Sequence, residues 1–469
     1  MSIQLIVILF YFAVTIVIGL YAQKKSKTSN SFHGAGLGVI MCVAAGTGEW
    51  LGGTSTTGVS EYGYLFGLSG AWYTIANSVG IIILAIFFAK LYRSLDTVTV
   101  PGIIEKFIGL DARVVSSALL TFVMLAVGTS QMIAAGTLGV SVLGLNYDVS
   151  VIIFGLGFII YTLAGGMTAV AYTNIMHLIA MYGGILLALF LVSKDLGGIS
   201  AITTALPDSY TNWFSIGPSK VSSWIIASIL GACTAQAGIQ PILAAKDGKV
   251  ARKAAFITAA IVAPFGICTT LLGMAAKVKF PDINAKQALP TLMMNLQPLA
   301  GGIVLASIMA AVLSTVSPII LASGTMITKD IYQRVLRPNA TDAQVLKMSR
   351  ITTALAGVIC CVIALLMYGS TKVLDIVYFA YSIRGALFVV LLLGIYWKKT
   401  SSKGAIYAMI CTGIVGIFWV AYKSVAGTYP IHSGFSETYA AVIVSAVCTV
   451  AFSICFPNKG TKGTGIKIT

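Results

Sequence analysis

The chain has 469 residues, of which 58% are hydrophobic and only 9% are charged, and its mean hydropathy is +0.94. Soluble domains carry about a quarter charged residues, so this composition excludes a soluble globular protein and indicates many membrane spans. The net charge of +16 would suggest nucleic acid as a partner of a soluble protein. Here the basic residues lie mainly between apolar segments, so we expect a lipid bilayer as the partner and no nucleic acid.

The chain contains many long apolar segments. About 13 of them are near 20 residues or longer, which is the length that a helix needs to cross a bilayer. They are predicted at 3–22, 37–62, 64–91, 114–143, 149–165, 173–192, 222–244, 254–276, 299–327, 351–368, 373–396, 404–422 and 438–456.

The first span decides the predicted orientation. No basic residue precedes it and three lysines follow it, which indicates a membrane anchor with an outside N-terminus rather than a signal peptide. With this orientation most of the 30 Lys and Arg residues fall on the cytoplasmic side, as the positive-inside rule requires. We therefore predict a multi-pass protein of the cell membrane with a cytoplasmic C-terminus.

Two spans are interrupted in mid-membrane by small and polar residues. The interruptions are 44–53 (AAGTGEWLGG) and 231–241 (GACTAQAGIQP). Unwound backbone is tolerated in lipid only where it lines a protein-enclosed cavity, because its N–H and C=O groups must be satisfied. Broken helices at corresponding positions of two halves are typical of the binding sites of secondary transporters.

The positions of these interruptions predict the domain organisation. When the first span and the last two are set aside, ten spans remain, and they form two consecutive blocks of five. Each block begins with an interrupted helix. Because five is an odd number, the two blocks must cross the membrane in opposite orientations. We predict an all-α integral membrane protein with a five-plus-five inverted repeat. Its single transporter domain, 1–456, contains an extra first helix (3–22), a first repeat (37–192), a second repeat (222–396) and two peripheral helices (404–456), followed by a short tail (457–469).

The ninth span contains two adjacent hydroxyl side chains, Ser314 and Thr315, with Ala311 three residues earlier on nearly the same face. Hydroxyls and freed carbonyls form an oxygen-only shell, which a sodium ion needs to replace its water. The first interruption supplies carbonyls three residues apart, at Ala44 and Thr47. Alternatively, both hydroxyls bond back to their own helix. The presence of an interrupted helix favours the sodium site.

Three runs of residues resemble the signature of the sodium:solute symporter family. They are 161–173 (YTLAGGMTAVAYT), 311–315 (AVLST) and 328–332 (TKDIY). The resemblance runs from the first span to the eleventh with little offset. Within the family, 50–53 (WLGG), 87–90 (FFAK) and 330–333 (DIYQ) are similar to the high-affinity choline transporter branch.

The resemblance implies a LeuT-type fold and sodium-coupled uptake by alternating access. It implies a sodium site formed by the carbonyls of Ala44, Thr47 and Ala311 with the hydroxyls of Ser314 and Thr315.

Two departures from the family pattern bear on the number of ions. Members with a second sodium site have an Asp where this chain has Asn174, and a hydroxyl where it has Pro318. Without that anion we expect one sodium ion per cycle.

Three ionisable residues lie at membrane depth, Glu49, Asp375 and Arg384. A charge at the bilayer centre costs about 2.5–3.5 kcal/mol or more, so each should have a partner or a cavity. In one interpretation Glu49 binds a solute cation, or Arg384 a solute carboxylate, or both bind a zwitterion. In the other they neutralise each other as a gate or a structural pair. Asp375 lies near the outer surface and is predicted to cap a helix or form a gate.

Four more residues complete the candidate substrate site. Trp50 and Gly53 lie in the first interruption, and Gln131 and Gln236 are intramembrane amides. Amides that join helices together are an equal alternative for the two glutamines.

Choline itself is not expected as the solute. The choline branch binds its quaternary ammonium in an aromatic cage through cation–π attraction. This chain keeps Trp50 at one cage position and has Asn77, Ala235 and approximately Val127 at others.

We therefore predict a sodium-coupled symporter that imports a small polar organic solute (an amine, an amino-acid-like compound or a carboxylate) and acts as a monomer or weak dimer. The alternative is a proton-coupled or uncoupled carrier of the same fold, with His177 as a candidate proton relay, although a lone buried His is usually a core residue. A channel is disfavoured because it would need rings of charges or carbonyls from an oligomer. An enzyme is disfavoured because three scattered histidines form no catalytic constellation.

Overall fold

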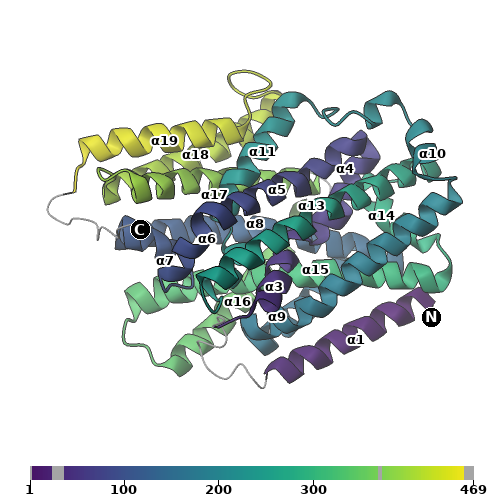
Figure 1. The fold of residues 1–469 in the computed structure, drawn as a ribbon, viewed down its shortest axis with the longest axis horizontal. Helices are drawn as coiled ribbons and strands as arrows, with labels where there is room; N and C mark the ends of the chain where they lie inside the picture. The colour runs from purple at the N-terminus through teal and green to yellow at the C-terminus, as the bar shows by residue number, and fades with distance from the viewer. Residues whose placement is uncertain (1–2, 24–35, 368–371, 459–469) are drawn as a thin grey trace.

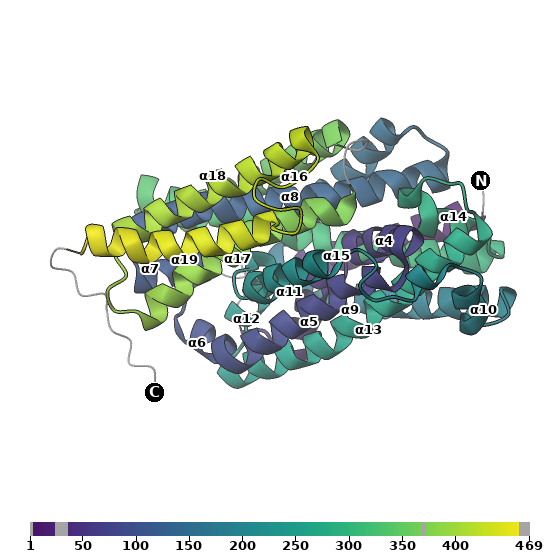
Figure 2. The same cartoon turned by 90° about the horizontal axis from the view of Figure 1, so that it is seen from above.

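The computed structural model describes residues 3–23, 36–367 and 372–458 (Figure 1). Within these residues the structure is helical, and its one β-type contact is an isolated parallel bridge between Leu37 and Ala245. The predicted all-α class is therefore observed. The bundle is elongated, and Figure 1 shows α1 (Ile3–Gln23) along one edge and α18 (Ser402–Ala426) with α19 (Glu437–Cys455) along the other. Figure 2 shows α18 and α19 side by side.

The other helices follow in two sets. The first set is α3 (Val39–Trp50), η1 (Thr54–Gly58), α4 (Val59–Phe66), η2 (Gly67–Ala71), α5 (Trp72–Ile83), η3 (Leu84–Phe88), α6 (Ala89–Ser94), α7 (Val100–Phe107), α8 (Leu110–Leu143) and α9 (Tyr147–Asp195). Two short elements, α10 (Ile199–Thr204) and η4 (Asp208–Tyr210), lead to the second set. It comprises α11 (Pro218–Ala232), α12 (Gln236–Leu243), α13 (Gly248–Lys279), η5 (Ala285–Gln287), α14 (Ala288–Met294), α15 (Pro298–Met326), η6 (Ile327–Leu336), α16 (Asp342–Met367) and α17 (Val373–Tyr396).

Ten helical stretches of the described chain are long and apolar enough to cross a membrane, and three shorter helices are also apolar. One stretch, Thr54–Ser94, has 41 residues, which as a straight helix would extend about 60 Å, twice the thickness of a bilayer core. Gly67, with φ of 65°, turns the chain between α4 and α5 within it. Gly166, with φ of 59° and ψ of −162°, likewise divides α9 into two segments. The number of about 13 spans stays a prediction.

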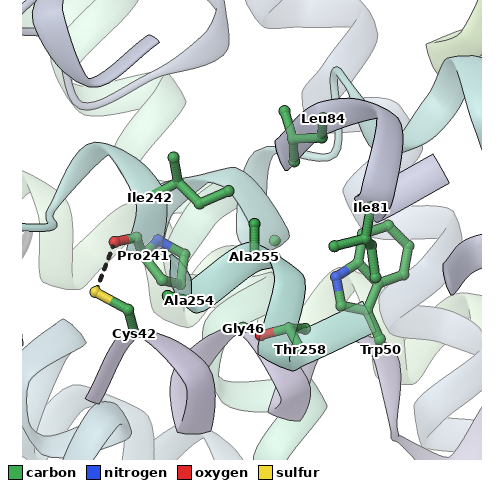
Figure 3. Close-up of a pocket in the computed structure, with 11 residues that line it drawn as sticks. Cys42, Gly46, Trp50, Ile81, Leu84, Pro241, Ile242, Ala254, Ala255 and Thr258 are labelled. Carbon is green, nitrogen blue, oxygen red and sulfur yellow. Dashed lines mark hydrogen bonds between the residues drawn. The ribbon is translucent and has the colours of Figure 1, made fainter. Parts of the chain in front are cut away.

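The two interrupted helices contact each other. The start of α3, in the first interrupted helix, lies against the end of α12, in the second. Leu37, just before α3, donates its N–H to the Ala244 carbonyl at 2.8 Å, and the Lys246 N–H returns to the Leu37 carbonyl at 2.9 Å. The Cys42 thiol donates to the Pro241 carbonyl at 3.3 Å (Figure 3). These contacts join α3 to α12, so the two helix breaks lie in one layer of the bundle.

The centre of the bundle is α15. Its most apolar segment is 94% buried, and it packs against α8, α9 and α3. The equivalent segments of α16 and α19 are only 33% buried, as expected for helices at the periphery that face lipid. The most enclosed helix is therefore the one that carries Ser314 and Thr315.

Candidate functional site

The first break begins where α3 ends at Trp50. Leu51 leaves helical geometry, with φ of −109° and ψ of 65°, and its N–H bonds to the Thr47 carbonyl at 2.9 Å. A Cβ atom on Gly52 would lie 2.3 Å from Thr315 Oγ1. No side chain fits at that distance, so glycine lets the broken backbone approach α15 closely.

An oxygen cluster lies where the break meets α15. The Ser314 hydroxyl donates to the Ala311 carbonyl at 2.9 Å and lies 3.4 Å from the Gly48 carbonyl. The Thr315 hydroxyl donates to the same Gly48 carbonyl. Two hydroxyls from one helix and the backbone of a second, interrupted helix therefore converge on one point.

This cluster contains three of the five predicted sodium ligands, Ala311, Ser314 and Thr315. Within the described residues neither hydroxyl contacts the Ala44 or Thr47 carbonyl, and the Thr47 carbonyl accepts the Leu51 N–H instead. The Gly48 carbonyl, which the sequence analysis did not single out, takes that place. The Thr47 hydroxyl is buried and has no hydrogen-bond partner in the described part of the chain.

Asn174, predicted to replace a carboxylate, does lie at the cluster. Its amide nitrogen is 3.3 Å from the Ser314 carbonyl, to which it donates. A Cβ on Gly48 would come within 2.2 Å of the same nitrogen. The side chain therefore presents N–H donors, rather than an anion, to the backbone beside the oxygen cluster.

Arg384 lies on α17 and is fully buried. Its guanidinium carbon is 3.4 Å from the ring centroid of Tyr381 and 5.2 Å from that of Trp50. Its three guanidinium nitrogens have no hydrogen-bond partner among the residues that the structure describes. Aromatic faces therefore stabilise the cation, while its N–H donors stay unused.

Glu49 is buried in the same region, next to Trp50 in the chain. Its charge and that of Arg384 are close enough to attract each other. Nevertheless no ion pair within 4.0 Å joins them in the described structure, and the carboxylate oxygen Oε2 has no hydrogen-bond partner there. The structure thus shows the two central charges near each other but not paired.

The two glutamines differ in their surroundings. The Gln131 amide donates to Thr54 Oγ1 at 2.6 Å, while its carbonyl oxygen, without a partner in the described chain, faces the break at 3.0 Å from the position a Gly53 Cβ would take. Gln236 accepts from the Val100 N–H at 2.7 Å and donates to the Val98 carbonyl at 3.2 Å. Gln131 and Gly53 therefore line the break, whereas both ends of the Gln236 amide hold the backbone before α7.

Trp50 also forms one wall of a narrow hollow between α3, α5, α12 and α13 (Figure 3). The other walls are mainly apolar, with Ile81, Pro241 and Ala255 among them. The hollow has room for about one water-sized molecule. Trp50 therefore separates this apolar space from Arg384.

Charged clusters close both ends of the bundle. At the end predicted to be extracellular (the outer end), Asp375 accepts from Tyr62 at 2.6 Å and from Lys220 at 3.0 Å. The Lys220 ammonium also lies over the Tyr62 and Trp224 rings, at 5.2 and 5.4 Å. These contacts tie α4, α11 and α17 together, and the cap or gate role of Asp375 stays a prediction.

At the opposite, inner end, Arg113 of α8 binds two carboxylates. It donates to fully buried Asp330 of η6, at 2.6 and 2.8 Å, and to Glu105 of α7. Asp330 also accepts from Thr99 at 2.7 Å, and Glu105 from Arg334 at 2.5 Å. Burial raises the pKa of Glu105, but the bonds from Arg334 and Arg113 outweigh it and lower the pKa below its ordinary value.

His177, the candidate proton relay, accepts or donates one bond, with its Nδ1 2.5 Å from the Tyr11 hydroxyl. Its Nε2 has no hydrogen-bond partner in the described structure. The bond joins α9 to α1, so in this structure the residue holds the extra first helix to the bundle.

Comparison with known proteins identifies the family. The sodium:solute symporter family matches residues 32–412. The chain belongs to this family. It is 26% identical to the osmoregulated proline transporter OpuE of Bacillus subtilis (strain 168), over 96% of each chain, and 27% identical to the uncharacterized symporter YwcA of the same organism, over 86% of this chain and 82% of the relative.

Solved structures show the same fold. A Na⁺-coupled sialic acid symporter aligns with a TM-score of 0.82, 19% identity, and coverage of 98% of this chain and 100% of that one. The MhsT complex with L-phenylalanine aligns at 0.58 with 15% identity, over 88% of this chain and 98% of that one. The predicted LeuT-type fold is confirmed, and the chain is a sodium-coupled secondary transporter of a small solute, not an enzyme.

Proposed function

We propose that one sodium ion per cycle binds at the oxygen cluster between α3 and α15 and drives import of a small polar solute bound beside it. The convergence of the Ser314 and Thr315 hydroxyls on the Gly48 carbonyl carries this proposal. With the Ala311 carbonyl, these groups offer four oxygens in one buried place. Thr47 contributes a further unused hydroxyl on the preceding residue.

Asn174 supports the expectation of a single ion. A carboxylate there would add the negative charge that holds a second cation, whereas this amide donates to the Ser314 carbonyl and occupies its lone pair. We therefore expect the transport current to depend on sodium with a Hill coefficient near one. A clearly higher coefficient would show that the chain binds a second ion despite Asn174.

The solute is placed at the first break, beside Glu49, Trp50, Gly53, Gln131 and Arg384. Glu49 and Arg384 have charged groups without hydrogen-bond partners in the described chain. The broken end of α3 carries both Glu49 and the Gly48 carbonyl of the oxygen cluster. An amine, an amino acid or a carboxylate would satisfy such groups, and OpuE is by name a proline transporter. Gln236 is expected to act in the closure of the inner end, since its amide holds the backbone before α7.

Alternating access follows from the two end clusters. In the predicted orientation, the contacts of Asp375 close the path to the outside and those of Arg113 close the path to the cytoplasm. Each cluster joins helices that must separate when that end of the bundle opens. In alternating access, the contacts of one cluster therefore break while those of the other stay intact.

The test is sodium-driven uptake into proteoliposomes, with Ser314→Ala and Thr315→Ala combined. Loss of two ligand oxygens should abolish the stimulation of uptake by sodium while the protein remains folded. Ser323→Ala is a matched control, because Ser323 is a buried serine of the same helix whose hydroxyl bonds back to Ile319 at 3.0 Å. Unchanged sodium dependence in the double variant would overturn the site, and uptake driven by a proton gradient alone would favour the alternative carrier.

A further inference from the structure

The centre of the bundle holds several buried polar groups that the fold leaves without partners. A polar group taken out of water is costly unless it is hydrogen-bonded, and native structures satisfy nearly all of them. Besides Thr47 and Gln131, the side chains near the first break that depart from this rule include Glu49, Asn77 and Arg384. The end clusters differ in that their charges form direct ion pairs, although Asp330 Oδ2 also has no hydrogen-bond partner in the described chain.

We propose that Glu49, Asn77 and Arg384 form the binding site of a zwitterionic solute, a small α-amino acid. Arg384 binds its carboxylate, Glu49 binds its ammonium, and Asn77 contributes a further hydrogen bond that selects the solute. This inference rests on the proposed function, because it assumes that the solute lies at the first break.

The stacking of Arg384 shows how its donors are presented. A guanidinium is planar, and its N–H groups point outward in that plane. The guanidinium carbon lies over the rings of Tyr381 and Trp50, which stabilise the charge, and no hydrogen bond uses the donors in the described chain. What remains is a fork of N–H groups, which matches the two oxygens of a carboxylate.

Glu49 supplies the opposite charge near Arg384 without pairing with it in the described chain. The two charges attract each other but form no ion pair within 4.0 Å in the described structure. If they were only a structural pair, direct contact would satisfy both at once. An α-amino acid carries its carboxylate and its ammonium on one carbon atom, so a single small molecule can satisfy both residues.

Asn77 extends the site along α5. Tyr73 and Ile81 lie four residues before and after it, so all three share one face of the helix. On that face the Tyr73 hydroxyl lies 3.1 Å from the Tyr381 hydroxyl, and Ile81 lies with Trp50 in the hollow (Figure 3). Asn77 therefore lies on the face of α5 between Tyr73, which contacts Tyr381, and Ile81, which lies with Trp50. It is fully buried, and neither its oxygen nor its nitrogen has a partner in the described chain.

The first experiment uses the unmodified protein and compares ligand classes. Purified full-length protein is screened by thermal shift in sodium chloride against the standard amino acids, monocarboxylates, primary amines and polyols. For the amino acid that binds most tightly, analogues that lack only the amino group or only the carboxylate are then titrated. We expect each analogue to bind at least about 100-fold more weakly, because each leaves a buried charge unpaired.

The outcomes separate this inference from the proposed function. Sodium-dependent binding of a monocarboxylate, an amine or a polyol, with no amino acid bound, would overturn the zwitterion while leaving the symporter intact. An amino acid that binds equally with and without sodium would instead contradict the proposed coupling. The absence of amino-acid binding in sodium overturns the inference in every case.

The second experiment assigns the groups. Arg384→Gln should abolish discrimination against the analogue that lacks the carboxylate, and Glu49→Gln should abolish discrimination against the analogue that lacks the amine. Asn77→Ala should lower the affinity for the amino acid by about tenfold or more. Arg350→Gln, at an exposed arginine of α16, is the matched control for loss of a charge.

The double variant Glu49→Gln with Arg384→Gln distinguishes a binding site from a structural pair. If the residues only neutralised each other, removing both would restore binding that either single change had lost. We expect no restoration. Recovery of wild-type affinity in the double variant would overturn the proposal.

Discussion

The centre and the inner end of the bundle both contain a buried arginine with a carboxylate nearby, and they treat these residues in opposite ways. At the inner end Arg113 donates to two carboxylates, and buried Asp330 also accepts from Thr99. At the centre the Arg384 guanidinium lies over aromatic rings, and within the described residues no ion pair joins it to Glu49. The cluster with direct ion pairs holds the structure together, whereas the unpaired charges at the centre are available to a ligand.

The largest effect on stability is expected at the inner end. Arg113→Met leaves fully buried Asp330 without its cation, and removal of one partner of a buried pair costs about 3–5 kcal/mol. Thermal unfolding in detergent should show a strong drop in melting temperature. Arg334→Met is the control, since that arginine is about half exposed and its pair contributes about 1 kcal/mol or less. Equal stability of the two variants would contradict the structural role of Arg113.

A smaller loss of stability is expected from a substitution in α3. Gly48→Ala would place a Cβ 2.2 Å from the Asn174 nitrogen and 2.9 Å from the Ser314 carbonyl oxygen. Such overpacking costs about 1–3 kcal/mol and would push apart the oxygens of the proposed sodium site, so both the melting temperature and the sodium affinity should fall. In Gly46→Ala, two residues earlier, the nearest atom would lie at 3.4 Å, so this variant should keep its sodium affinity. The same sodium affinity in both variants would place the ion elsewhere.

A substitution in the charged cluster at the outer end should reduce stability less. Lys220 and Asp375 are each about one-third exposed, so solvent screens their pair, and Lys220→Met should cost about 1 kcal/mol or less. Because the pair closes the outer end, the variant should nevertheless expose a cysteine introduced at the first break to a membrane-impermeant thiol reagent more than the parent does. Unchanged labelling would show that Lys220 does not hold the gate.

The smallest effect on stability is expected at Arg384. Arg384→Met removes a buried cation that has no hydrogen-bond partner in the described chain, so it leaves no donor or acceptor newly unpaired. We expect an unchanged or higher melting temperature together with loss of uptake. A loss of stability as large as that of Arg113→Met would make Arg384 a structural residue and erase the contrast between the two regions.

Much of the fold could be predicted because its signals are local. Glycines and polar residues inside apolar stretches mark both breaks, and the observed ends of α3 and α11 lie within them. Ser314 and Thr315 were found from their spacing in a single helix. The Gly48 carbonyl was missed because a carbonyl is present at every residue, and only the path of the backbone after Trp50 decides which one faces α15.

Partners that are distant in sequence could not be predicted. Asp330 was noted only as part of a family-like run, yet Arg113, 217 positions away, pairs with it. Gln236 was a substrate candidate by its polarity in an apolar span, and only packing showed that the backbone before α7 satisfies it. Asn77 was noted only as a departure from an aromatic cage. Sequence shows which residues are polar and buried, but not which of them stay unsatisfied.

The central claim is that the group of Glu49, Asn77 and Arg384 binds an amino acid next to the sodium cluster, so that each ligand strengthens the other. The direct test is calorimetry on purified protein at constant ionic strength, with potassium replacing sodium. Affinity for the best amino acid is measured with and without sodium, and affinity for sodium with and without that amino acid. Because coupling is reciprocal, both should tighten by the same factor, about 5–150-fold. Amino-acid affinity that is independent of sodium would contradict the account.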